Sequence, residues 1–178
     1  MRNPSLIIAT LAITGCIRAA APSPIPEIKG QRVTAFGLDR IDEMVGTGPQ
    51  VEPRKCVYAH YTGWLNNGKK FDSSRDTAPG GFPRPPISFP QGLRRVIAGW
   101  DLGFEGMRVG GKRRLFIPYQ LGYGERGRPP AIPPMSQLIF DIELVAVADT
   151  LPTAAPAAGQ RPAQGPACPT WDAVKPTQ

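Results

Sequence analysis

Between residues 58 and 147, the side chains best suited to chemistry are one carboxylate, Asp72, and several aromatic groups. Trp100 and Tyr123 each stand beside glycine, in segments that follow apolar residues. No nucleophile has an evident partner base here, and His60 is the only histidine, which argues against a metal centre. A carboxylate among aromatic walls suits a reaction that depends on shape and removal of water rather than on a covalent intermediate.

These residues belong to an ordered series of short motifs. The series is Tyr61-Thr62-Gly63, Gly68-Lys69-Lys70-Phe71-Asp72-Ser73-Ser74, Val96-Ile97-Ala98-Gly99-Trp100, Leu121-Gly122-Tyr123-Gly124 and Leu138-Ile139-Phe140-Asp141-Ile142-Glu143-Leu144. In order and spacing it resembles the FKBP-type peptidyl-prolyl cis-trans isomerases, over about residues 33 to 147. The resemblance implies an enzyme without cofactor or metal that speeds rotation about X-Pro bonds. Proline-containing polypeptides are the implied substrates, and macrolide immunosuppressants are candidate ligands.

The resemblance also assigns roles to individual residues. Trp100 is the implied floor of a prolyl pocket, and Asp72 is an electrostatic group beside the twisting bond rather than a proton-transfer base. The Tyr123 hydroxyl and the Ile97 backbone N–H are the implied donors to substrate carbonyl groups. The implied walls are aromatic or branched aliphatic side chains: Tyr61, Phe71, Ile87, Val96, Ile97, Ile132 and Phe140. Taken singly, each residue also fits a structural role in a core or a turn.

Several features depart from the family pattern and bear on substrate preference. Residues 77–86 are several positions longer than the usual connection. Ile87 stands where many members have an aromatic wall, and Phe82 is a candidate to fold back in its place. Arg95 stands where some relatives have an acid, and Arg128 where some have histidine. Two cations at the rim predict a preference for acidic peptides.

Apolar residues recur at every second position through most of this region, which predicts strands. A first strand is expected over residues 33–44, and Asn67-Gly68 predicts a tight hairpin turn. In residues 138–145 two acids share one face, so the other face is expected to be buried. Only residues 98–106 show helical spacing. The pattern predicts an α+β fold, a mainly antiparallel sheet curled over one short helix with flexible tails at both ends, and the resembled family has the same fold.

The first 21 residues predict an export signal, because a positive charge precedes an apolar run too short to span a bilayer as a mature helix. Ile13-Thr14-Gly15-Cys16 resembles a bacterial lipobox, which predicts a lipid anchor on Cys16. Cleavage after Ala19-Ala20-Ala21 is the alternative, and it would release a soluble protein. We therefore expect an exported, periplasmic protein, membrane-anchored if Cys16 carries lipid.

Composition divides the chain into four parts. The export segment 1–21 is followed by a stiff Pro-rich linker, 22–32, and an isomerase domain, 33–148. Residues 149–178 are rich in Ala, Pro, Gly, Gln and Thr, which predicts a disordered tail. Trp171 is the exception in this tail, and both docking on the domain and exposure to solvent remain open for it.

Cys56 and Cys168 form an even pair once Cys16 is lipidated. A disulfide between them suits an oxidising compartment and would pin the tail to the domain. Two unpaired thiols are an equal alternative. Neither cysteine has the CxxC spacing of a redox or zinc motif.

The net charge of +7 and the pI near 9.7 would permit nucleic-acid binding. However, the cations are dispersed except for Arg94-Arg95 and Lys112-Arg113-Arg114, so we expect no nucleic-acid partner. A tethered monomer is the simplest assembly. The function predicted is X-Pro isomerisation during the folding of exported proteins. The alternative is an FKBP-like binding module or chaperone without significant turnover.

Overall fold

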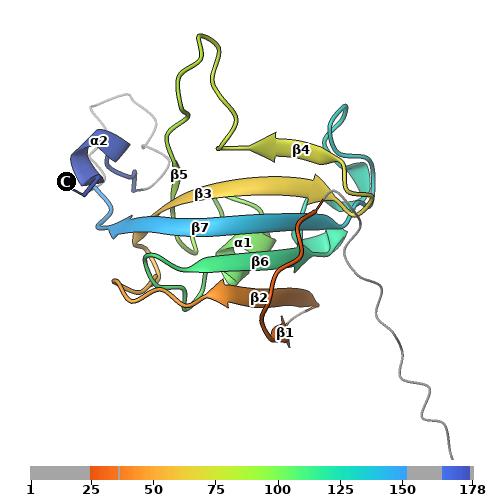
Figure 1. Cartoon of the computed structure of the whole chain (residues 1–178), viewed down its shortest axis with the longest axis horizontal. Coiled ribbons are helices and arrows are strands. Elements are labelled where there is room, and N and C mark those ends of the chain that lie inside the picture. Colours follow the sequence, from red (N-terminus) through yellow and green to blue (C-terminus); the bar gives the residue numbers. More distant parts are fainter. Residues whose placement is uncertain (1–24, 36, 152–165, 177–178) are drawn as a thin grey trace, which may run out of the picture.

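Among the residues that the structure describes, alternating apolar and polar side chains produce seven strands, which pair antiparallel into one curled sheet over a short helix (Figure 1). The computed structural model describes residues 25–35, 37–151 and 166–176. The predicted α+β fold is confirmed. The strands are β1 Arg32–Ala35, β2 Leu38–Met44, β3 Cys56–Leu65, β4 Lys70–Ser73, β5 Ile87–Pro90, β6 Lys112–Ile117 and β7 Leu138–Ala148. The helices are α1 Ala98–Gly103, the 3-10 helices η1 Tyr119–Leu121 and η2 Gly124–Arg126, and α2 Trp171–Val174.

The strand order is β1-β2-β6-β7-β3-β4, and β5 also pairs with β3. Strands β4 and β5 share one edge of β3, so the chain between them, residues 74–86, leaves this edge as a protruding loop (Figure 1). We call it the 74–86 loop. The single strand predicted over residues 33–44 is wrong, because Gly37 adopts a φ of 77° and the segment forms the hairpin of β1 and β2.

The two faces of the sheet follow the predicted alternation. We call the face toward α1 the inner face and the opposite one the outer face. On β7, Phe140 and Ile142 are buried on the inner face, whereas Asp141 and Glu143 alternate to the outer face. Asn67-Gly68 makes the predicted turn between β3 and β4, with a φ of 84° at Gly68.

Helix α1 contains two glycines, which have weak helix propensity, and the packing of the helix explains their presence. A Cβ on Gly99 would lie 2.4 Å from a methyl of Ile117, and one on Gly103 would lie 2.3 Å from a methyl of Leu115. Both partners belong to β6, so the glycines allow the helix backbone to approach the sheet closely. The helix ends three residues earlier than predicted, at Gly103.

The outer face is partly covered by the segment before β1, which sequence analysis had assigned to a linker. Ile25 is 5% exposed and packs in a cluster with Trp64, Phe116 and Ile139. The Pro26 carbonyl accepts a hydrogen bond from Arg114, at 2.5 Å. The end of the predicted linker therefore belongs to the domain.

The C-terminal segment 166–176 covers another part of the outer face, beside the start of β3 and the end of β7, where α2 lies (Figure 1). Cys56 and Cys168 form a disulfide, which resolves the two alternatives left by the sequence. The Tyr58 hydroxyl donates to the Pro169 carbonyl at 2.7 Å. For these residues the predicted disorder is wrong, because a covalent bond and a fully buried tyrosine hold them to the sheet.

Two arginines of the basic cluster on β6 are buried and hydrogen-bonded, so they do not form a basic surface patch. Arg113 is 5% exposed and donates to Asp42 and to the Gly103 carbonyl, which joins β2 and β6 to the end of α1. Arg114 is 2% exposed and donates to Asp141. Buried charges need such partners because desolvation is costly. Among the described residues, no helix has the length and apolar character needed to cross a membrane.

Candidate active site

A cavity of about 240 Å³ opens on the inner face, between the sheet and α1. Eight of the ten predicted site residues line it; Ile97 and Ile132 do not. We call it the prolyl pocket. Its lining consists of Tyr61, Phe71, Asp72, Ile87, Arg95, Val96, Trp100, Tyr123, Arg128 and Phe140.

Trp100, the predicted floor of the prolyl pocket, lies on the first turn of α1. It is 4% exposed, and its ring meets the rings of Tyr61 and Phe140 edge-on, at centroid distances of 5.0 and 5.2 Å. Edge-to-face contacts of this kind are the favourable geometry for aromatic rings. Gly63 makes the arrangement possible, since a Cβ there would lie 2.7 Å from both Phe71 and Phe140. The result is a rigid, mostly apolar cavity.

The carboxylate of Asp72 is held in place by two donors. The Tyr61 hydroxyl donates to Oδ2 at 2.5 Å, and the Ser73 backbone N–H donates to Oδ1 at 2.9 Å. Burial, followed by the hydrogen bond to Asp72, raises the pKa of Tyr61, so its hydroxyl stays protonated and keeps donating. Tyr61 was predicted only as a wall; its second task is to orient the carboxylate.

Arg84 is a site residue that sequence analysis missed. Its guanidinium lies 3.4 Å from Asp72 Oδ1 and donates to the Ser73 carbonyl at 2.9 Å. Arg84 belongs to the 74–86 loop, which therefore returns a cation to the carboxylate. The unusual length was a signal that the loop matters, but nothing in its local pattern pointed to this contact.

Ile97 and Ile132 support the pocket from outside its lining. The Ile97 carbonyl accepts from the Trp100 N–H at 2.9 Å, and Ile97 precedes the first turn of α1, where N–H groups have no intrahelical acceptor. Ile132 is 2% exposed in the core and exchanges two backbone hydrogen bonds with Arg128. The carbonyl-gripping role of Ile97 and the loop role of Ile132 stay predictions.

Arg95 and Arg128 both line the prolyl pocket, as the sequence predicted for the rim. The Arg128 guanidinium lies 5.8 Å from the centroid of the Tyr123 ring, a cation–π distance. The wall at Ile87 is aliphatic, and Phe82 does not replace an aromatic there.

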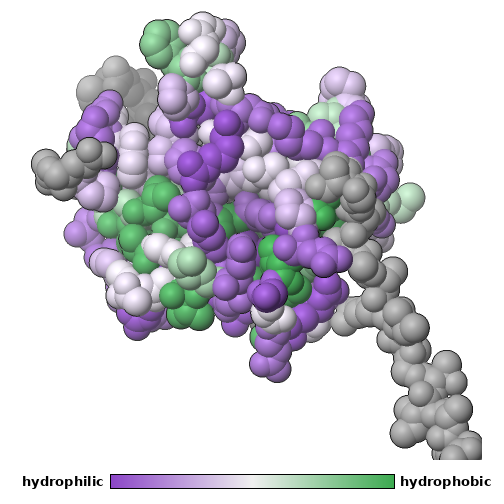
Figure 2. All heavy atoms as spheres, in the orientation of Figure 1, coloured by the Kyte–Doolittle hydropathy of each residue, from purple (hydrophilic) through white to green (hydrophobic). Residues whose placement is uncertain are grey.

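Phe82 is instead 72% exposed, on the protruding 74–86 loop, where Figure 2 shows apolar atoms at the tip. Gly80 and Gly81 both have positive φ, and the Ala78 N–H donates to the Phe82 carbonyl in a tight turn. This local turn directs the loop away from the domain, so the predicted return of Phe82 is wrong.

No cluster of three or more His, Cys, Asp or Glu suited to a metal ion occurs in residues 25–35, 37–151 and 166–176. The single histidine, His60, lies on the outer face of β3 and contacts Ser74 Oγ at 3.1 Å. Burial, and then the charge of Arg75, lower its pKa. The predicted lipidation site, Cys16, lies outside the described residues.

Comparison with known proteins agrees with this geometry. The family model for FKBP-type peptidyl-prolyl cis-trans isomerase matches residues 48–145. The FK506-binding protein of Neisseria meningitidis serogroup A is 48% identical over 106 residues, which are 60% of this chain and 92% of that protein. The FK506-binding protein 4 of Dictyostelium discoideum is 51% identical over 63% of this chain, which spans only 29% of that relative.

A solved structure matches as well. The peptidyl-prolyl cis-trans isomerase of Pseudomonas syringae pv. tomato is 36% identical, with a TM-score of 0.55, over 65% of this chain and 78% of that one. The chain therefore belongs to the FKBP-type peptidyl-prolyl cis-trans isomerase family.

Proposed function

We propose that the protein accelerates cis–trans isomerisation of X-Pro bonds in exported polypeptides, from a lipid anchor on Cys16. The prolyl pocket is the observation that carries the catalytic part of this proposal. It combines a buried Trp100 floor with an Asp72 carboxylate whose oxygens are held by Tyr61 and Ser73.

Rotation about a peptide bond has a barrier of about 18–20 kcal/mol, because the nitrogen shares its lone pair with the carbonyl. The cis and trans forms of an X-Pro bond differ by only about 0.5–1 kcal/mol. A catalyst must therefore lower the barrier rather than shift the equilibrium. The twisted amide has lost resonance, and its carbonyl is less polar than that of the planar form.

An apolar cavity favours the less polar twisted amide over the hydrated planar one. Here Trp100, Phe140 and Phe71 exclude water around a proline ring, and the Tyr123 hydroxyl is available to a substrate carbonyl. Asp72 acts as a fixed charge beside the bond. No nucleophile and no proton transfer are required.

Two features of the chain, its N-terminal sequence and its disulfide, support an exported location. The apolar N-terminal run and the lipobox-like Ile13-Thr14-Gly15-Cys16 support export and lipidation. The disulfide between Cys56 and Cys168 supports an oxidising compartment, since such bonds are rare in the cytosol. Uncatalysed isomerisation takes tens of seconds, slow enough to limit folding of polypeptides arriving there.

Exchange spectroscopy on a short Leu-Pro peptide tests the catalytic part. We expect the full chain to speed cis–trans exchange and an Asp72→Ala variant to do so less. Asp76→Ala is the matched control, because Asp76 is an exposed acid that pairs with Lys70 outside the pocket. A folded protein that binds the peptide without faster exchange would support the binding-module alternative.

Mass spectrometry of the N-terminal peptide, after expression in an exporting bacterium, tests the anchor. We expect a lipid-modified Cys16 as the first residue, and a Cys16→Ser variant without lipid. An unmodified N-terminus after Ala21 would instead indicate a soluble exported protein, and an intact leader would contradict export.

A further inference from the structure

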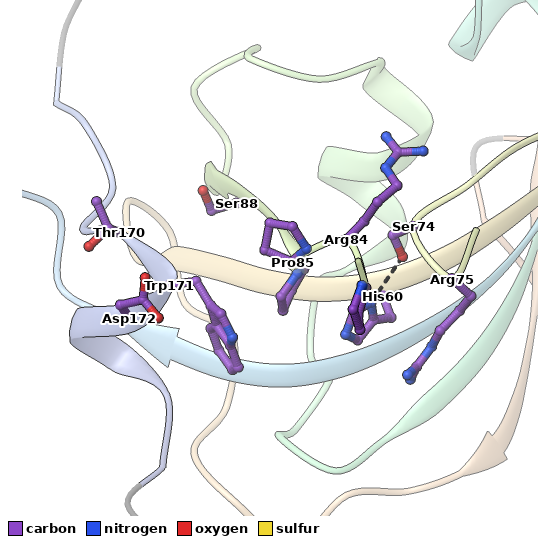
Figure 3. Close-up of a pocket in the computed structure, with 11 residues that line it drawn as sticks. His60, Ser74, Arg75, Arg84, Pro85, Ser88, Thr170, Trp171 and Asp172 are labelled. Atoms are coloured by element: carbon purple, nitrogen blue, oxygen red, sulfur yellow. Dashed lines mark hydrogen bonds between the residues drawn. The ribbon is translucent and has the colours of Figure 1, made fainter. Parts of the chain in front are cut away.

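A second cavity, of about 840 Å³, lies beside the outer face of β3, against about 240 Å³ for the prolyl pocket. We call it the outer groove. His60 and Ser74 lie at its base, and Pro83, Pro85 and Trp171 are among the side chains that line it. In Figure 3, Pro85 lies between Trp171 and His60 along the sheet. Its walls thus come mainly from the 74–86 loop and the C-terminal segment.

The C-terminal wall is fixed before any ligand arrives. The Cys56–Cys168 disulfide ties it to β3, and the Tyr58 hydroxyl donates to the Pro169 carbonyl at 2.7 Å. The rings of Tyr58 and Trp171 lie 5.9 Å apart. A wall held in this way loses little conformational freedom on binding, which favours affinity.

The outer groove and the prolyl pocket meet at the edge of β3. Arg84 lines the groove and also contacts the Asp72 carboxylate of the pocket. On the next part of the chain, Pro86 lines the groove and Ile87 lines the pocket. A polypeptide whose proline sits in the pocket can therefore continue past Arg84 into the groove.

The lining suits a polypeptide rather than a compact apolar ligand. Prolines and an indole ring offer flat apolar surfaces, while Ser88 and Thr170 offer hydroxyls. Two lining side chains are cations, Arg75 and Arg84, and one is an acid, Asp172. All three have partners, since Arg75 pairs with Glu143, Arg84 with Asp72 and Asp172 with Lys175. The charges of the lining are therefore compensated, and its apolar rings and hydroxyls are left to meet an extended chain.

We propose that the outer groove binds an extended segment of the substrate polypeptide, next to the proline held in the prolyl pocket. This inference rests on the proposed isomerase function and names a second contact for the same substrate. It makes the enzyme more efficient on polypeptides than on short peptides.

The three tryptophans provide the test, since each reports a different surface. Trp100 lies in the prolyl pocket, Trp171 in the outer groove, and Trp64 under the N-terminal segment. NMR of the indole N–H signals follows titration with a Leu-Pro peptide of about four residues, and with the same peptide extended to about twelve residues. Each residue added in extended conformation lengthens the peptide by about 3.3 Å.

We expect the short peptide to shift the Trp100 signal alone and the long peptide to shift Trp100 and Trp171, with Trp64 unchanged. The kcat/KM of the long peptide should exceed that of the short one by about fivefold, the scale of one aromatic contact. Trp171→Ala should remove this advantage and leave short-peptide turnover unchanged. Mass spectrometry confirms that the disulfide persists in the variant, and Val45→Ala, a change at an exposed apolar residue away from the groove lining, is the control.

An unshifted Trp171 signal with the long peptide, or an equal shift with both peptides, overturns the proposal. So does a long-peptide advantage that survives in Trp171→Ala. If neither peptide is turned over, the proposed function fails, while the Trp171 signal still decides whether the groove binds the extension.

Discussion

The two faces of β3 line two cavities whose walls come from different parts of the chain. On the inner face, Tyr61 helps to close a small pocket whose lining lies within the residues matched by the family model, 48–145. One residue earlier, His60 faces a larger groove whose far wall, around Trp171, lies outside that match. A single strand thus separates a pocket that lies within the family match from a groove that the C-terminal segment completes.

The two cavities also differ in what holds their walls in place. The inner pocket is held by ring packing around Trp100. The outer groove is held by one disulfide and one buried tyrosine. Changes to the inner face should therefore affect catalysed exchange, and changes to the outer face should leave turnover of short peptides unaffected.

The largest effect is expected at the pocket floor. Trp100→Ala removes a buried ring that contacts Tyr61, Phe89, Phe104 and Phe140, so it should cost about 3–5 kcal/mol of unfolding free energy. Catalysed exchange should be lost as well. Urea denaturation and exchange spectroscopy measure the two effects. A loss below about 1 kcal/mol would mean that the ring is not part of the packed core.

The next effect concerns the outer face. Cys168→Ser opens a disulfide between residues separated by 112 positions and should cost about 2–4 kcal/mol in urea denaturation. Turnover of a short Leu-Pro peptide, assayed where the variant is folded, should equal that of the wild type. Wild-type protein reduced with dithiothreitol is the matched comparison. Equal fall of short-peptide turnover in both samples would show that the two faces are coupled.

A smaller effect is expected for the charge in the pocket. Asp72→Asn keeps an acceptor for the Tyr61 hydroxyl but removes the negative charge. A hydrogen bond to a charged group contributes about 1.5–3 kcal/mol, so we expect catalysed exchange to fall roughly tenfold. Exchange spectroscopy measures it beside Asp76→Asn. Unchanged exchange in Asp72→Asn would limit Asp72 to a structural role.

The smallest effect is a pH dependence of stability from the outer face. Burial, then the charge of Arg75, lower the pKa of His60, while Glu143 opposes them. The unfolded chain, with an ordinary value near 6.5, therefore takes up the proton first as pH falls. Stability should decline as pH drops below about 6.5 and level off below the folded-state pKa. Urea midpoints from pH 8 downward, to about pH 5, should show a smaller decline in His60→Gln. An identical decline in the variant would place the titrating group elsewhere.

Local patterns predicted much of the inner face. The alternation of apolar residues predicted β3 and β7, and Asn67-Gly68 predicted a turn. Of the ten site residues that the family resemblance implied, eight line one cavity. Each of these features depends on neighbours in sequence or on a shared motif.

The outer face depends on contacts between residues far apart in the sequence, which the spacing of apolar residues cannot predict. The Tyr58 hydroxyl and the Pro169 carbonyl are 111 positions apart, and Ile25 packs beside Ile139. Composition alone assigned both terminal segments to linker and tail, because it cannot show that one disulfide or one buried isoleucine anchors them. The contact of Arg84 with Asp72 likewise arises from how the loop closes, which its sequence does not specify.

One matched pair of variants tests the division between the faces most directly. Exchange spectroscopy on the same short Leu-Pro peptide compares Trp100→Ala with Trp171→Ala under conditions in which both are folded. We predict that exchange falls to the uncatalysed rate with Trp100→Ala and stays at the wild-type rate with Trp171→Ala. Full activity in Trp100→Ala, or equal loss in both variants, would contradict the assignment of bond rotation to the inner face alone.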